Sequence, residues 1–155
     1  MRAAMPLHRT MLCDRVLFRQ LRRRACDGSA TGGELNQLAL LYDTGRGCLQ
    51  SDGKAFRYML AAADGGSLLA MATVATVYQT CGAPRRARAW WTKAAGRALP
   101  EAQRKVAEYA VAEDDVDSAI FWYTASSRNG DQTASRWLAT HYLGGTGNGR
   151  KLWPA

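Results

Sequence analysis

The chain has 155 residues, of which 47% are hydrophobic and 22% charged; this composition suits one domain with a buried core and excludes a disordered tail. Its 27 alanines and only 4 prolines favour helices, and the lack of long alternating runs of Val, Ile and Thr excludes an extended β-architecture. No stretch approaches the roughly 18 uncharged apolar residues that a bilayer span needs, so a transmembrane protein is excluded as well.

The formal net charge of +8 is unevenly distributed along the chain. Residues 1–30 hold seven arginines against two acids, and residues 65–99 hold five basic residues and no acid. Residues 100–130 show the reverse, with six acids against three bases. A basic excess attracts anionic partners in general, so RNA, lipid and acidic proteins all stay open.

The N-terminal segment lacks the apolar core of a secretory signal, and its arginines fall on one face of a helix predicted over residues 9–26. Leu17, Leu21 and Ala25 follow one another at four-residue steps on another face. This pattern is typical of a mitochondrial presequence and equally of a basic first helix of the fold. Both interpretations stay open.

Prolines, glycines and aspartates mark the boundaries of the helices further along. Pro84 and Pro100 suit the first turn of a helix. Gly66 and Gly130 suit helix ends, and Asp52 and Asp115 suit helix caps. Together with apolar spacings of three and four residues, they predict eight helices, over residues 9–26, 33–44, 52–64, 67–80, 84–97, 100–112, 115–128 and 131–143.

A 32-residue repeat runs through the middle of the chain. Pairs of bulky residues recur at this interval, at Tyr58-Met59, Trp90-Trp91 and Trp122-Tyr123. Small residues recur in step with them, at Ala55, Ala87 and Ala119, at Ala62-Ala63, Ala94-Ala95 and Ser126-Ser127, and at Gly66, Ala98 and Gly130. Since the spacings are helical, one repeat is predicted to be two short antiparallel helices whose small residues let them approach closely.

A second pattern fills the intervals, with an apolar residue, a small residue and then an aromatic or small one. It reads Leu38-Ala39 with Tyr42, Val74-Ala75 with Tyr78, Val106-Ala107 with Ala110, and Leu138-Ala139 with Tyr142. The first step is 36 residues rather than 32, because the first unit has a longer loop over residues 45–52. One such unit cannot bury its apolar face alone, so stacking of units supplies the stability.

These motifs resemble the Sel-like repeat (SLR) family, a relative of the tetratricopeptide repeat. The best-matching unit reads Leu38-Ala39, Tyr42, Gly45-x-Gly47, Asp52, Lys54-Ala55, Tyr58, Ala62-Ala63 and Gly66. A truncated fourth unit restarts the pattern with Ala134, Leu138-Ala139, Tyr142 and Gly145-x-Gly147. The second and third units lack the Gly-x-Gly loop, and Met59 stands where the family has an aromatic residue.

The resemblance implies an all-α fold, a short right-handed α-solenoid of about three and a half antiparallel helix hairpins behind an N-terminal capping helix. We expect a basic segment with the capping helix over residues 1–32, a repeat domain over residues 33–147 and a C-terminal tail over residues 148–155. Within the repeat domain, the units are expected near residues 33–66, 67–98, 99–130 and, truncated, 131–147.

Residue types that catalyse reactions or bind metals form no group that would indicate an enzyme. His8 lies in the arginine-rich leader, and His141 is expected on the surface or in packing. The cysteines have neither metal-ligand nor disulfide spacing, and we expect buried, reduced thiols of an intracellular protein at Cys13, Cys26, Cys48 and Cys81. We therefore predict no catalytic residue, no metal and no cofactor.

Two segments nearly match binding motifs. Residues 144–151 approach a phosphate-binding loop, but Arg150 and Lys151 replace its Lys-Ser/Thr pair and a helix precedes it, so an inter-helix loop is expected. An acidic run is expected to cap the following helix rather than to hold a cation, at Glu113, Asp114, Asp115 and Asp117.

The resemblance also implies that the first helix of each unit lines a concave binding surface. Outward positions are expected at Asn36, Gln37 and Leu40, at Ala72, Thr73 and Thr76, at Arg104, Lys105 and Glu108, and at Arg136, Trp137 and Thr140. Among these, the predicted partner-binding residues are Asn36, Thr73, Thr76, Arg104, Lys105, Arg136 and Trp137. We expect the basic ones to clamp carboxylates of an acidic protein or peptide, with Trp137 as an exposed apolar anchor.

The predicted function is a non-catalytic protein-interaction scaffold or adaptor. The alternative is a structural subunit of a large assembly, such as a mitochondrial ribonucleoprotein or a membrane complex, whose basic surfaces contact RNA or acidic neighbours. Those surfaces contain Arg19, Arg22, Arg23, Arg24, Arg85, Arg86 and Arg88. We expect an intracellular, reducing location, which is mitochondrial if the N-terminal arginines form a targeting signal.

Overall fold

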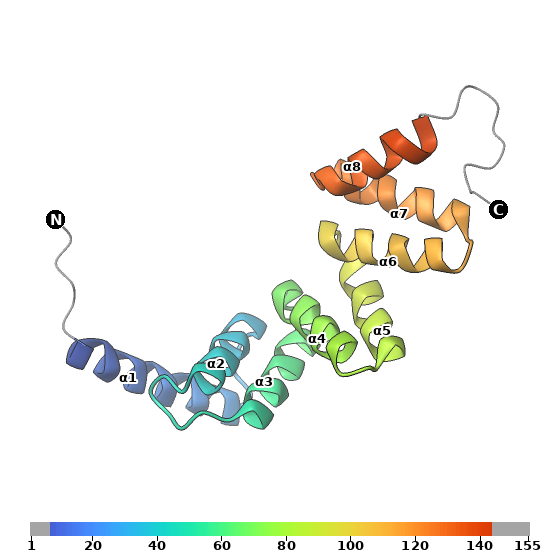
Figure 1. Ribbon diagram of the computed structural model, residues 1–155. Helices are drawn as coiled ribbons and strands as arrows, with labels where there is room; N and C mark the ends of the chain where they lie inside the picture. The colour runs from blue at the N-terminus through green and yellow to red at the C-terminus, as the bar shows by residue number, and fades with distance from the viewer. Residues whose placement is uncertain (1–6, 144–155) are drawn as a thin grey trace, which may run out of the picture. The chain divides into compact units, whose positions relative to one another are not determined.

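The computed structural model describes residues 7–143, with side chains for residues 13–141, and this part of the chain is helical apart from short connections. The helices are α1 (Leu7–Cys26), α2 (Gly32–Thr44), α3 (Asp52–Asp64), α4 (Leu68–Thr80), α5 (Pro84–Ala95), α6 (Pro100–Ala112), α7 (Val116–Arg128) and α8 (Gln132–Leu138) (Figure 1). A π-helical turn, η1 (Ala139–Leu143), follows α8 directly. The described residues form two compact units, one within Met1–Val74 and one within Ala75–Ala155.

The predicted all-α class of sequential antiparallel helix pairs is confirmed by these elements. Between residues 26 and 132, every helix boundary lies within two residues of its predicted place. The last prediction was only partly right, because the helix expected over residues 131–143 changes to π-helical geometry at Ala139. The hand of the solenoid and the domain limits at residues 32 and 148 stay predictions.

A complete capping box starts α2. The Thr31 hydroxyl accepts a bond from the Glu34 backbone N–H at 3.3 Å, and the Glu34 carboxylate accepts one from the Thr31 backbone N–H at 2.8 Å. These two bonds satisfy amides that have no partner inside a helix. At the other end, Gly45 has a left-handed φ of 69° and its N–H donates to the Leu41 carbonyl, which is the ordinary use of glycine after a helix.

The other helix starts follow the predicted punctuation with one exception. Pro84 and Pro100 are the first residues of α5 and α6, where the missing N–H costs nothing. Asp115 caps α7 by accepting a bond from the Ser118 N–H at 3.1 Å. The cap of α3 is Ser51 rather than the predicted aspartate that follows it, because the serine hydroxyl already accepts from the backbone three residues ahead.

Three turn positions spaced by 32 residues share a positive φ. The angle is 89° at Gly66, 61° at Ala98 and 95° at Gly130. A second pair at the same interval, Gly82 and Asp114, has φ of 71° and 59°. A side chain with a Cβ is strained in this region, so the repeat keeps the turn conformation even where its glycine has been replaced.

The first unit has a core built between α1, α2 and α3. Phe18 and Leu21 of α1 are buried against Leu38 and Tyr42 of α2. The Phe18 and Tyr42 rings meet edge to face with centroids 5.2 Å apart, and Tyr42 stacks on the half-buried Tyr58 of α3 at 5.5 Å. These contacts fix which side of α1 faces inward.

The long loop of the first unit packs against α1. A Cβ added to Gly47 would lie 2.5 Å from the Asp14 carbonyl oxygen and 2.9 Å from the Arg15 backbone nitrogen. The neighbouring Arg46 pairs with the Asp14 carboxylate through two bonds of 3.0 Å. The Gly-x-Gly motif therefore fastens the capping helix to the first hairpin.

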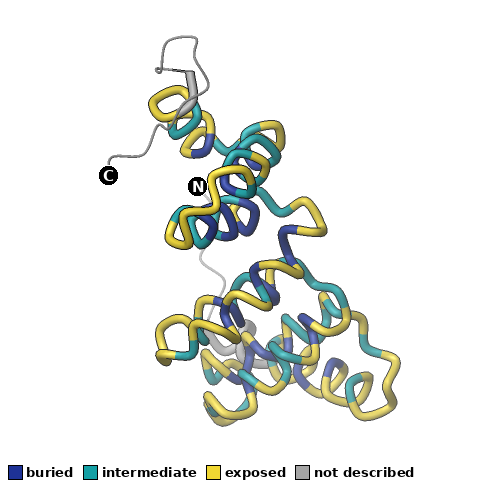
Figure 2. Tube along the Cα trace, turned by 90° about the vertical axis from the view of Figure 1, so that its right-hand side faces the viewer, coloured by how far each residue is buried: buried dark blue, intermediate teal, exposed yellow. Residues whose placement is uncertain are grey.

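In the second unit the small residues of the repeat that lie within helices are mostly buried, whereas Ala98 and Gly130 in the turns are exposed. Figure 2 shows buried and exposed positions alternating along the helices. Ala87 and Ala119 are fully buried, and so is Ser126, which stands in an alanine position of the ladder. Trp91 is 1% exposed, and its indole Nε1 is buried without a hydrogen-bond partner among the described residues. Within the described residues, no helix is both long enough and apolar enough to cross a bilayer.

Candidate partner-binding face

The predicted partner-binding residues lie on the first helices of the hairpins. Asn36 is on α2, Thr73 and Thr76 on α4, Arg104 and Lys105 on α6, and Arg136 and Trp137 on α8. Thr76 and Arg136 are exposed and the others are half-buried. Asn36 and Thr73 belong to the first compact unit and the rest to the second, where contacts between described side chains join α6 to α8.

Arg104 links α6 to the beginning of α8. Its Nε donates to Oδ2 of Asp131 at 3.0 Å, and its Nη1 pairs with Glu108 one turn further along α6. The arginine side chain is 22% exposed and the Asp131 side chain 12%. At this burial an ion pair is screened less by water than at a free surface.

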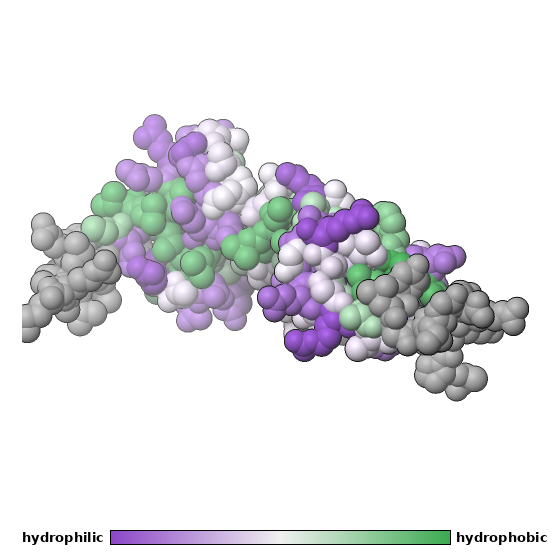
Figure 3. All heavy atoms as spheres, turned by 90° about the horizontal axis from the view of Figure 1, so that it is seen from above, coloured by the Kyte–Doolittle hydropathy of each residue, from purple (hydrophilic) through white to green (hydrophobic). Residues whose placement is uncertain are grey.

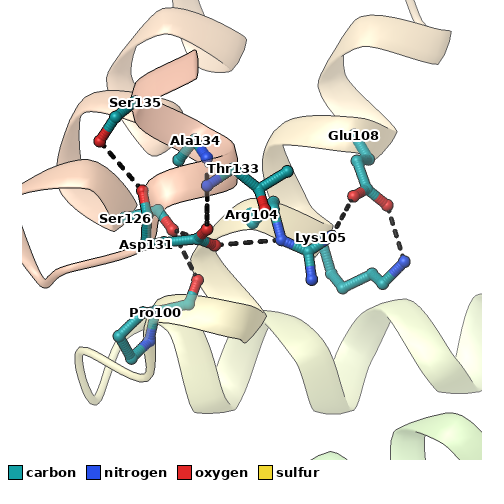
Figure 4. Close-up of polar contacts among 9 residues, drawn as sticks. All are labelled: Pro100, Arg104, Lys105, Glu108, Ser126, Asp131, Thr133, Ala134 and Ser135. Atoms are coloured by element: carbon teal, nitrogen blue, oxygen red, sulfur yellow. Dashed lines mark hydrogen bonds and ion pairs between the residues drawn. The ribbon is translucent and has the colours of Figure 1, made fainter. Parts of the chain in front are cut away.

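Asp131 is the centre of this polar cluster (Figure 4). Its Oδ1 accepts bonds from the backbone N–H groups of Thr133 at 2.8 Å and Ala134 at 3.2 Å, which caps α8. Its Oδ2 lies 3.1 Å from the buried Ser126 hydroxyl, whose oxygen is also 2.7 Å from the Pro100 carbonyl. One carboxylate thus connects the last turn of α7, the first turn of α8 and, through Arg104, α6.

These bonds set the protonation behaviour of Asp131. Partial burial alone would raise its pKa, but the amides of Ala134 and Thr133, the Ser126 hydroxyl and the charge of Arg104 outweigh burial. The pKa of Asp131 is therefore lowered. The carboxylate stays charged at neutral pH.

The positive charge of Lys105 is also paired with an acidic side chain of the same chain. Its Nζ lies 2.8 Å from Oε2 of Glu108, the same carboxylate that binds Arg104. Although partial burial lowers the pKa of Arg104, the charges and hydrogen bonds of Glu108 and Asp131 raise it overall. The two cations predicted to clamp a partner thus already face two internal carboxylates, and this strip is charge-balanced rather than basic.

Trp137 is the middle ring of a stack. It lies parallel to the buried Tyr123 of α7, with centroids 4.0 Å apart, and to the exposed His141, 4.8 Å away. Burial raises the pKa of Tyr123, so its phenol stays neutral. The tryptophan is half-buried rather than exposed as expected, because it fills the space between α7 and α8. His141 has the surface and packing role that was predicted.

Arg136 is the predicted cation that remains uncompensated. It is exposed on α8 and forms no ion pair with an acidic side chain of residues 13–141. One turn further along, in η1, the exposed Thr140 donates its hydroxyl to the carbonyls of Arg136 and Trp137. A negative charge brought to α8 would meet Arg136 without displacing an internal partner.

The corresponding residues of α2 and α4 form a neutral surface. Asn36 is half-buried, and the Thr73 hydroxyl donates to the Leu69 carbonyl one turn before it. Leu40 and Leu69 are the large apolar side chains exposed nearby in sequence, at 54% and 66%. The predicted binding positions on α2 and α4 are themselves uncharged.

Sequence reasoning missed the importance of Tyr123, Ser126 and Asp131. The signals were present in the ladder. A serine at a buried alanine position must find a hydrogen-bond partner, and an aspartate directly after a turn glycine is a strong cap candidate. That the Ser126 hydroxyl would bond to Asp131, and Asp131 to Arg104, 27 residues earlier, is a tertiary property.

The prediction that the acidic run caps α7 is confirmed for Asp115. Glu113 has a different role, because it lies at the end of α6 and forms a two-pronged ion pair with Arg88 of α5. Among the described residues, no group of histidine, cysteine or acidic side chains is placed to hold a metal ion.

The expectation of buried thiols was wrong for three of the four cysteines. Cys13, Cys26 and Cys81 are exposed, and Cys48 is half-buried. Cys13 and Cys26 lie on α1 away from its buried residues, and Cys81 lies in the turn after α4. The side chain of His8 and the glycine-rich loop over residues 144–151 lie outside the described part.

The arginines of the basic surfaces differ in how they are held. Arg24 pairs with Glu34, Arg88 with Glu113, and Arg23 lies 3.8 Å from Asp27 at a largely exposed site. Arg86 lies over the Tyr78 ring at 5.6 Å. The remaining members of this predicted set are exposed, at Arg19, Arg22 and Arg85.

On the face drawn in Figure 3, hydrophobic side chains form small groups between hydrophilic ones. The exposed large hydrophobic residues are Val16, Leu17, Leu40, Leu49, Leu69, Val116 and Phe121. Phe121, 63% exposed, meets Trp122 edge to face at 5.1 Å.

No protein-family model matches the sequence, and no curated protein matches it. Among solved structures, a Sel1 repeat protein from Oxalobacter formigenes superposes with a TM-score of 0.69 over 79% of this chain and 96% of its own, at 25% identity. The chain has the Sel1-like repeat fold. A protective antigen with an SLR fold, present in uropathogenic Escherichia coli strains, gives a TM-score of 0.65 over 87% of this chain at 24% identity. The match spans 30% of that longer protein.

The SLR fold confirms the resemblance drawn from the 32-residue ladder. It is a tetratricopeptide-like helical repeat fold, which generally serves as a protein-interaction scaffold and is typically non-catalytic. In such arrays the exposed faces of the first helices are the natural place for a partner.

Proposed function

We propose that this SLR protein is a non-catalytic adaptor that binds a protein or peptide segment along α6 and α8. The observation that supports this is the presence on α6 and α8 of the half-buried Trp137 together with a charge-balanced strip, made of Arg104, Lys105, Glu108 and Asp131. Asn36, Thr73 and Thr76 hold the equivalent positions on α2 and α4, and we assign them polar contacts in their own parts of the chain.

The proposed partner is acidic, with an apolar side chain next to a carboxylate. Its carboxylate pairs with the uncompensated Arg136, and its apolar group packs on the edge of Trp137. A second carboxylate can bind Lys105 only by replacing Glu108, so that contact adds little free energy. Trp137 and Arg136 are therefore the residues that carry most of the proposed affinity.

The test uses short peptides selected for binding to the purified full chain, with affinities measured by calorimetry. Trp137→Ala and Arg136→Glu should each weaken the selected acidic peptides about tenfold or more, the scale of a hot-spot residue. The matched control is Arg128→Glu, which makes the same charge change on α7. Equal affinities for all four proteins would refute the proposed site.

A further inference from the structure

The first helix, α1, carries a second candidate binding surface, separate from the one on α6 and α8. Arg15, Arg19 and Arg22 are all exposed, and we call them the arginine stripe. At 100° and 1.5 Å per residue they lie on one side of α1, with Arg19 about 6 Å and Arg22 about 10.5 Å along the axis from Arg15. The stripe thus presents one guanidinium group per helical turn.

The packing of α1 keeps this stripe turned outward. Phe18 and Leu21 are buried in the core of the first unit, on the side of the helix that adjoins the stripe. The close approach of Gly47 to the backbone of Asp14 fixes the helix from another direction. Rotating the stripe inward would expose both apolar side chains.

Acidic side chains near α1 do not neutralise the stripe. Each is already engaged by an arginine outside it: Asp14 by Arg46, Glu34 by Arg24 and Asp27 by Arg23. None of the three stripe arginines pairs with an acidic side chain of residues 13–141. This contrasts with Arg104, which faces two carboxylates. The three positive charges of the arginine stripe are therefore available to bind an anion from outside the chain.

The remaining surface of α1 argues against a membrane as that anion. An interfacial helix needs a continuous exposed apolar face, but Phe18 and Leu21 are used in the core. Among residues 13–26, the large apolar side chains exposed on α1 are Val16, at 53%, and Leu17, at 39%. Two partly exposed side chains supply a smaller apolar area than the continuous face of an interfacial helix.

The spacing and the type of the stripe residues favour consecutive phosphate groups as the ligand. Residues 13–26 contain five arginines and no lysine, and the guanidinium fork matches the oxygens of a phosphate group. A nucleic acid strand supplies one charge per nucleotide along its length. A strand can therefore engage all three arginines without any special sequence.

We propose that the arginine stripe binds consecutive backbone phosphates of a single nucleic acid strand, with no preference for base sequence. This surface is independent of the peptide site on α6 and α8. The chain would then hold a protein segment and a nucleic acid strand through different helices.

The experiment measures binding of the full chain to a fluorescent oligouridine RNA of about 15 nucleotides, by anisotropy, from about 50 to about 300 mM salt. The test variant is the triple change Arg15→Gln, Arg19→Gln and Arg22→Gln. The matched control changes three exposed arginines elsewhere, Arg57→Gln, Arg97→Gln and Arg128→Gln. Both variants lower the net charge by three, and circular dichroism verifies their helix content.

Three phosphate contacts on a single strand predict that the stripe variant lowers the slope of log K against log salt by about 2. The same variant should bind at least about tenfold more weakly at about 100 mM salt, while the control keeps most of the affinity. Equal losses in both variants would show a net-charge effect and overturn the proposal, as would absence of binding by the unmodified chain.

Two competitors separate the other partner classes. Polyglutamate of equal charge should displace the RNA less well than unlabelled RNA does; equal displacement would mean an acidic protein is the partner and would refute the nucleic acid site. Stripe-dependent binding to anionic lipid vesicles without RNA binding would refute it too. The peptide variants of α8 should leave RNA binding unchanged, so failure of one proposal is distinguishable from failure of the other.

Discussion

Nε of Arg104 donates to Oδ2 of Asp131 across 3.0 Å, and this bond joins α6 to the start of α8. The same carboxylate caps α8 with its other oxygen. Asp131 therefore combines a helix cap with an ion pair that connects two helices.

Replacing Asp131 with alanine should destabilise the second unit by about 2–3 kcal/mol, because a cap of about 1 kcal/mol and a charged hydrogen bond of about 1.5–3 kcal/mol are lost together without being fully additive. Urea unfolding followed by tryptophan fluorescence measures this, since all five tryptophans come after Val74 in the sequence. Asp43→Ala, an exposed residue on α2, is the control and should change stability by less than about 0.5 kcal/mol. A loss no larger than the control's would mean that the network adds nothing.

Acid should weaken the second unit through the same carboxylate. The folded state lowers the pKa of Asp131, so the unfolded chain takes up this proton first. The contribution is complete above the unfolded pKa of about 4 and is lost as the pH falls through the lower folded value. Between about pH 5 and about pH 2.5, the unmodified protein should lose stability more steeply than Asp131→Asn. Parallel pH profiles of the two proteins would contradict this assignment.

Ala98→Gly should stabilise the protein by about 0.5–1 kcal/mol. Its φ of 61° costs an alanine about 1–2 kcal/mol, and glycine recovers most of this after allowing for its greater freedom when unfolded. The reciprocal change Gly130→Ala, at φ 95° with open space around the added Cβ, should destabilise by about 1 kcal/mol or more. Thermal unfolding followed by circular dichroism compares them. Destabilisation by both changes would show that the turn conformation is not the cause.

Gly47→Ala should detach α1 from the first hairpin. The new Cβ would lie 2.5 Å from a backbone oxygen of α1, and the φ of 75° adds strain, for a total of about 3 kcal/mol. Gly28→Ala is the matched control, because its φ of 72° is similar but nothing lies within 4 Å of the added Cβ. Hydrogen exchange of the α1 amides should accelerate strongly in the first variant and little in the second. Equal protection in both would refute the docking of this loop.

The helices and their buried small residues could be predicted from the sequence because the same residue types recur at the same positions in successive repeats. Ala55, Ala87 and Ala119 recur at one interval and all are buried. Pro84 and Pro100 start their helices at the predicted residue. Each position is fixed by a local rule, such as the missing N–H of proline or the small volume that two close helices require.

Whether the side chains of the candidate site are available to a partner could be predicted less well. Arg104, Lys105 and Trp137 were correctly placed on first helices, but their availability depends on residues in other helices. Asp131 and Tyr123 reach them only after the hairpins pack, so no spacing within α6 or α8 reveals that the charges are balanced or that the tryptophan is stacked. The mitochondrial and reducing location, and the acidic character of the partner, stay predictions.

The left-handed alanine at residue 98 has a consequence for what sustains the connection between α5 and α6. A glycine would adopt this conformation without strain, whereas alanine adopts it at a cost of about 1–2 kcal/mol, which the packing of α5 against α6 has to offset. The bend is therefore maintained by contacts between the two helices rather than by the preference of its own residue.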